Sequence, residues 1–190
     1  MRTRKLHYYS GITIALFICS HLVNHSFALI GIDKHIEIMQ MFRKVYRNIF
    51  AETILLLAIV SQIFSGIQLF RSQYKRDKTF FEKIQVWSGL YMAFFFVIHL
   101  SAIMAGRFLL DLDTNFYFGA AGLNRFPYNL FFIPYYSLAI LSFFGHIASI
   151  HYKKMGLRNR DARTQSFLII LIGFVVTLLL MYGLTNGFKD

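Results

Sequence analysis

The sequence predicts an all-α membrane protein, a bundle of five transmembrane helices forming a single domain over residues 1–190. Two observations carry this prediction. The chain is 56% hydrophobic and only 15% charged, whereas soluble domains are about 25% charged. Its mean hydropathy is +0.51. The apolar residues also gather in stretches of about twenty, which is the length of helix that crosses a bilayer.

Five such stretches follow one another, separated by polar or basic segments. We predict spans at residues 9–31, 49–70, 84–106, 129–151 and 166–185. Between the first two spans, "HIEIMQMFRKVYRN" has the pattern of an amphipathic helix that lies along the membrane surface. Its basic residues, and His35 within it, are expected to face solvent.

The distribution of Lys and Arg predicts the orientation, because basic residues concentrate on the cytoplasmic side. They cluster at the N-terminus and in the loops at 71–83 and 152–165, with fewer on the opposite side. We therefore expect a cytoplasmic N-terminus, an outside C-terminus and a location in the cytoplasmic (inner) membrane. Topology also explains the net charge of +11, so nucleic acid is not an expected partner. A single cysteine, Cys19, can form neither an internal disulfide nor a zinc site.

Histidines inside the spans are the candidate functional residues. At a rise of about 1.5 Å per residue, His21 lies ~18 Å, His25 ~24 Å and His99 ~22 Å beyond the cytoplasmic ends of their spans. Two neutral imidazoles at matched depth on different helices can bind the opposite faces of one haem iron. The sequence therefore predicts a haem b between His21 and His99. Zinc fits poorly, because it needs further ligands at that depth.

The remaining histidines allow other interpretations. His25, one turn beyond His21, is expected to support the site or to pack near the outer surface. His146 lies only ~8 Å from the cytoplasmic end of the fourth span. It is either a ligand or a polar residue that is hydrogen-bonded to a serine or a carbonyl.

The order of several motifs resembles that of one family. They are "RKLHYYSG", "SHLVN", "FAETILLLAIVSQIFSG", "IQVWSGLYMAFFFVIHL", "LSFFGHIASIHY" and "RDARTQSFLIILIGFVV". Over residues 2–185 the chain resembles the single-polypeptide, five-helix cytochrome b anchor subunits of succinate:quinone and quinol:fumarate reductases.

The resemblance implies a role for each matching position. His21 and His99 match the two ligands of the outer haem, which the depth argument also selects. His146 matches one ligand of an inner haem, but the position of its partner is Gln62, and the second span contains no histidine. We therefore expect one firmly held haem b, with the inner haem absent or weakly held. The alternative for Gln62 is a hydrogen bond to His146.

The resemblance also implies partners and an electron path. A flavoprotein subunit and an iron–sulfur subunit would dock on the cytoplasmic face, and the chain would pass electrons through haem to a membrane quinone. Glu52 and either Asp111 or Asp113 are candidates for proton exchange near the membrane surface. A haem-free scaffold or assembly protein of the same fold is the main alternative. A transporter or channel is disfavoured because no span carries a charge deep in the membrane.

Overall fold

The computed structural model describes residues 2–73, 79–156 and 160–186, and over these ranges it is all-helical. Five of the described helices are long and apolar enough to cross a membrane. The predicted all-α fold with five candidate spans is therefore confirmed. The long helices are α1 (Arg2–Ser26), α3 (Ile49–Gln73), α4 (Phe80–Phe108), α6 (Asn129–Met155) and α7 (Arg160–Asn186). The short ones are α2 (Ile32–Tyr46) and α5 (Phe116–Ala120).

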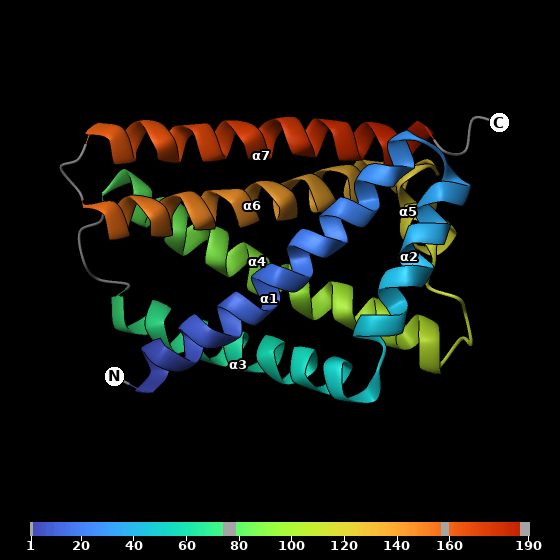
Figure 1. Cartoon of the computed structure of the whole chain (residues 1–190), viewed down its shortest axis with the longest axis horizontal. Coiled ribbons are helices and arrows are strands. Elements are labelled where there is room, and N and C mark those ends of the chain that lie inside the picture. The colour runs from blue at the N-terminus through green and yellow to red at the C-terminus, as the bar shows by residue number, and fades with distance from the viewer. Residues whose placement is uncertain (1, 74–78, 157–159, 187–190) are drawn as a thin grey trace.

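The long helices run lengthwise through the molecule, and the start of α1 and the end of α7 lie at opposite ends (Figure 1). The closest helix pairs are α6 with α7, α4 with α6, and α1 with α3. Helices α2 and α5 lie together at one end of the bundle, near the C-terminal end of α7. We call this the α2 end.

The predicted spans correspond closely to the long helices, which extend a few residues beyond most of them. The exception is the first span, whose predicted end at residue 31 lies past a short 3-10 turn at Phe27–Leu29. Local sequence signals determine where two other helices begin or end. A capping box at Thr79 and Glu82 begins α4. Gly156, at φ 100°, ends α6 in a backbone conformation that side chains disfavour.

Several basic residues that predicted the orientation lie outside the described residues. They are Lys75, Arg76, Lys78, Arg158 and Lys189.

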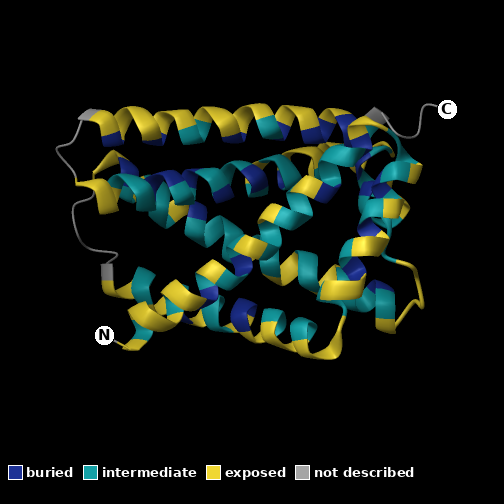
Figure 2. Ribbon diagram, viewed as in Figure 1, coloured by how far each residue is buried: buried dark blue, intermediate teal, exposed yellow. Residues whose placement is uncertain are grey.

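The outer faces of the long helices are exposed (Figure 2), and many of the exposed side chains are large and apolar. Leu16 and Trp87 are each 70% exposed, and α7 exposes large apolar side chains along most of its length. Buried polar side chains bond to helix backbone: Ser149 donates to the Gly145 carbonyl and Thr177 to the Gly173 carbonyl. This arrangement suits a lipid environment, in which each polar group needs a partner within the protein.

The core has two clusters of buried apolar residues. The larger one joins α5, α6 and α7 to the end of α1, and includes Phe116, Ile140 and Leu180. The smaller one joins α1 to α3 through Ile14, Ala58 and Ile59. Members of both clusters line the interior that also contains the histidines.

Gly173 sets the spacing between α6 and α7. A Cβ added there would lie 2.4 Å from the Cβ of Phe144, so Gly173→Ala must push the two helices apart. Overpacking of this kind typically costs about 1–3 kcal/mol. We predict a clear fall in thermal stability in detergent, measured by circular dichroism. Gly119→Ala is the matched control, because a Cβ there meets nothing within 4 Å; equal stability of the two variants would contradict the prediction.

Candidate functional site

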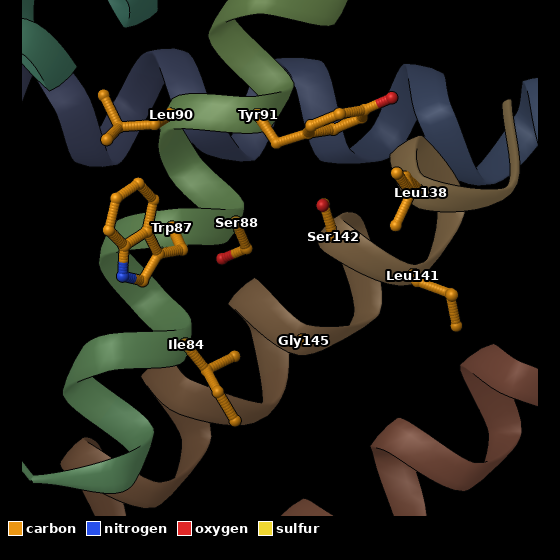
Figure 3. A pocket seen from close by; sticks show the side chains of 9 residues that line it. All are labelled: Ile84, Trp87, Ser88, Leu90, Tyr91, Leu138, Leu141, Ser142 and Gly145. Carbon is orange, nitrogen blue, oxygen red and sulfur yellow. The ribbon is translucent and has the colours of Figure 1, made fainter. Parts of the chain in front are cut away.

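Two of the hollows among the described helices bear on function. The first is an open groove of about 560 Å³ between α4 and α6. Figure 3 shows its lining, in which the Ser88 and Ser142 hydroxyls lie among apolar and aromatic side chains.

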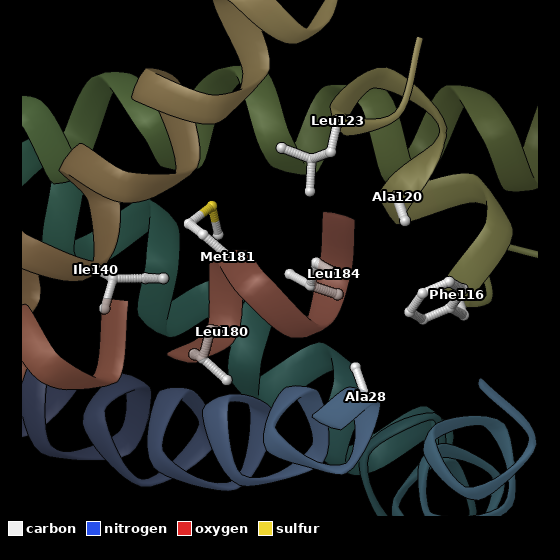
Figure 4. Packing of buried hydrophobic residues seen from close by; sticks show 8 residues of the cluster. All are labelled: Ala28, Phe116, Ala120, Leu123, Ile140, Leu180, Met181 and Leu184. Carbon is white, nitrogen blue, oxygen red and sulfur yellow. The ribbon is translucent and has the colours of Figure 1, made fainter. Parts of the chain in front are cut away.

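The second hollow is a more enclosed cavity of about 270 Å³, which we call the central cavity. This volume is near the lower end for small-molecule sites, which occupy about 300–1,000 Å³. Its walls are mostly apolar and include most of the larger core cluster, drawn in Figure 4. His21, His25, His35 and His99 all line it. We call these four residues the central histidine cluster.

His21 on α1 and His99 on α4 face each other in the central cavity. Their ring centroids are 6.4 Å apart, with 68° between the ring planes. His99 also stacks on Phe95, at 4.9 Å between centroids. In the described part of the chain no hydrogen bond involves either ring nitrogen of His99. An imidazole inside a membrane helix without a polar partner is costly, so a ligand in the cavity would compensate it.

His25 links His21 to the α2 end. Its Nε2 is 3.1 Å from Nε2 of His21, and its Nδ1 is 3.1 Å from Nε2 of His35. The Asn24 amide also donates to Nε2 of His35 at 3.2 Å. His25 therefore lies between His21 and His35 and contacts both.

His35 differs from the expectation that it faces solvent. It is only 1% exposed, because α2 turns this face toward α1 and α5, where His35 packs on Phe116. Its Nδ1 and the Oδ1 of Asn24 are buried without a partner. The sequence pattern could not reveal this, since an amphipathic helix packed on protein looks the same as one at a membrane surface.

The donor set of the central cavity fits a haem. Two imidazoles that bind one iron through nitrogens about 2 Å from the metal have centroids about 6 Å apart, close to the observed separation. Among the described residues no group of three or more His, Cys, Asp or Glu side chains could hold a bare metal ion, whereas haem iron needs only two protein ligands. Binding iron through Nε2 of His21 would replace its contact with His25.

The structure places His146 away from this cluster. Nδ1 of His146 donates to the Gln85 carbonyl at 3.1 Å and lies 3.1 Å from the Ser88 hydroxyl. This is one of the two interpretations left open by the sequence, a histidine bonded to a serine and a carbonyl. It leaves Nε2 available, but His146 lines neither of the two hollows described above.

Gln62 does not bond to His146, contrary to the alternative considered from the sequence. Its carbonyl accepts from Ser10 at 2.6 Å, and its amide nitrogen donates to Nε2 of His7 at 3.2 Å. Nδ1 of His7 in turn lies 2.9 Å from the Ser65 hydroxyl. This polar network between α1 and α3 satisfies Gln62 without any cofactor.

Charged residues close the α2 end of the central cavity. Arg107 pairs with Glu52, and Arg43 pairs with Asp113 at 2.7 Å. The guanidinium of Arg47 donates to the Thr114 hydroxyl at 2.7 Å. We call these residues the arginine cap. Sequence analysis missed it, because its contacts join α2 and α4 to segments 50 or more residues away.

Comparison with known proteins finds no matching family, no matching curated protein and no matching solved structure.

The burial of His35 predicts a pH effect on stability. Burial, and then the positive charge of Arg43, lower the pKa of His35 from 6.5 to about 4. The unfolded chain therefore takes up this proton at higher pH than the folded chain, and stability falls as pH drops from 6.5 toward 4. We predict that His35→Gln loses less thermal stability over this interval than the unsubstituted protein. Parallel losses in the two proteins would contradict the assignment.

Proposed function

We propose that this chain is a cytochrome b membrane anchor subunit, in which His21 and His99 hold one haem b. The observation that carries the proposal is the unpartnered imidazole of His99, which faces His21 across the central cavity. The order of motifs, which resembles that of the five-helix anchors of succinate:quinone and quinol:fumarate reductases, supports the same conclusion. In this role the chain passes electrons between a separate iron–sulfur subunit and a membrane quinone.

The residues around the cavity have distinct tasks in this proposal. Bound haem supplies a one-electron redox centre. His21 and His99 would hold the haem iron through their imidazoles, and Phe95, which stacks on the His99 ring, would keep that ring in place. The apolar walls keep water from the site. A low dielectric and axial imidazoles are two of the levers by which a protein sets a haem potential.

We propose a single haem rather than two. Gln62 stands where a second pair would need a histidine, and an amide is a poor iron ligand beside imidazole. The bonds of Gln62 to Ser10 and His7 account for its place without a cofactor.

Orientation and partners follow from the charge distribution. The N-terminus and two loops at that end of the bundle carry most of the Lys and Arg, so we place this end in the cytoplasm and the α2 end outside, in the cytoplasmic membrane. A flavoprotein subunit and an iron–sulfur subunit would dock on the cytoplasmic face. Of the acidic candidates for proton exchange, Glu52 and Asp113 are both ion-paired.

A haem-free scaffold or assembly protein is the second candidate. One observation favours it, because the Nε2 atom of His21 already has a partner in His25. Haem content separates the two functions.

The assignment of ligands predicts that His21→Ala and His99→Ala each lose the haem. The pyridine haemochrome of the purified protein measures the loss. His25→Ala is the control and should keep the iron, since His25 supports the site without binding it. If both ligand variants keep full haem, the assignment fails. If His25→Ala alone loses haem, the ligand that pairs with His99 is His25, one helical turn from His21.

Because Gln62 stands where the resemblance implies a histidine, we predict one low-spin haem per chain. Gln62→His should raise the number of haems per chain, because it supplies the histidine on α3 that a second ligand pair with His146 would need. Gln62 contacts His7, and the charge of His7 acts on His146. Gln68→His on the same helix is the control and should leave the number unchanged. Haem per polypeptide decides the matter, and two low-spin haems in the unsubstituted protein would refute the one-haem proposal.

A further inference from the structure

The α2 end of the central cavity has the chemistry of a site for an acidic group. Most of the cavity wall is apolar, but Arg47, Arg107 and Glu52 line this end. A cavity that is apolar along its length and cationic at one end suits an amphipathic ligand with an anionic group.

The charges of the arginine cap do not balance within the described residues. Glu52 neutralises Arg107, and Asp113 neutralises Arg43. Arg47 is the third arginine, and its recorded partner is the neutral Thr114 hydroxyl. Arg43 is only 7% exposed, and its Nε and Nη2 are buried without a partner. The cap therefore has one positive charge in excess and spare hydrogen-bond donors.

The environment of Arg47 is unfavourable to its own charge. Burial, followed by the nearby Arg43 and Arg107, lowers the pKa of Arg47, and Tyr46 and Asp113 offset this only in part. A negative group beside it would favour the charged form. Half-buried arginines bind carboxylates well, because the planar guanidinium can donate two parallel hydrogen bonds.

Ring contacts connect this end of the cavity to the central histidine cluster. Phe17 stacks on His21 at 5.6 Å between centroids and meets Tyr46 edge-on at 5.4 Å. Tyr46 directly precedes Arg47 and lines the same cavity. The imidazoles of His21 and His99 and the guanidinium of Arg47 therefore line one continuous cavity.

We propose that Arg47 binds a carboxylate of the cavity ligand, a propionate of the haem, so that the propionate edge points toward the α2 end. This inference rests on the proposed function, and it assigns the orientation of the haem as well as its ligands. Thr114 is a positioning residue, because its hydroxyl holds the Arg47 side chain toward the cavity.

The test compares haem with haem dimethyl ester, in which both propionates are neutral. Haem-free protein, purified in detergent from cells that cannot make haem, is titrated with each and followed by the Soret absorption. Arg47→Gln should weaken haem binding about 10- to 100-fold, the range for a charge-assisted bond, and leave ester binding unchanged. Arg47→Lys should restore part of the affinity. Lys44→Gln is the matched control, because Lys44 is an exposed cation in the last turn of α2, three residues before Arg47.

The outcomes separate this inference from the proposed function. If Arg47→Gln binds haem as tightly as the unsubstituted protein, the propionate contact is overturned, while a requirement for His21 and His99 would still stand. If neither haem nor its ester binds the unsubstituted protein, both proposals fail. Oleate provides a second source of carboxylate. If oleate displaces both haem and ester, the cavity takes a fatty acid and the inference is overturned.

Discussion

The need to satisfy polar side chains away from water governs the interior of this bundle. In lipid a polar group without a partner costs free energy, and the helices are arranged so that most such groups meet. His7, Gln62, Ser10 and Ser65 close one network between α1 and α3. His146 bonds to the Gln85 carbonyl on α4. The central cavity is where this pairing is incomplete: no hydrogen bond to His99 is found among the described residues, and Nδ1 of His35 and Oδ1 of Asn24 also have no partner.

The cavity exists because α2 and α5 cover the end of the bundle. Helix α2 inserts His35 between Asn24, His25 and Phe116. The arginine cap, which combines residues of α2, α3 and α4 with residues just after α2 and α4, lies at the same end. The central histidine cluster and the cap thus belong to one site, with apolar walls between them. The apolar walls exclude water from the site, while the arginine cap presents charge at one end of it.

Much of this fold could be predicted from sequence, because hydropathy and length suffice to find spans and helical rise converts sequence position into depth. Those arguments brought His21 and His99 to one level, and the structure places their rings together. The partner of Gln62 and the burial of His35 could not be found this way. Both depend on how helices cross and rotate, which is decided by long-range packing. The ion pair between Arg107 and Glu52 joins segments whose proximity no local pattern records.

The central claim is that two imidazoles from α1 and α4 bind one iron. The most direct measurement is the electron paramagnetic resonance spectrum of the oxidised, purified protein with its native sequence, recorded at a known protein concentration. The account predicts a single low-spin ferric signal typical of bis-imidazole haem b. An intact, folded protein that carries no haem, or one that gives only a high-spin signal, would contradict it.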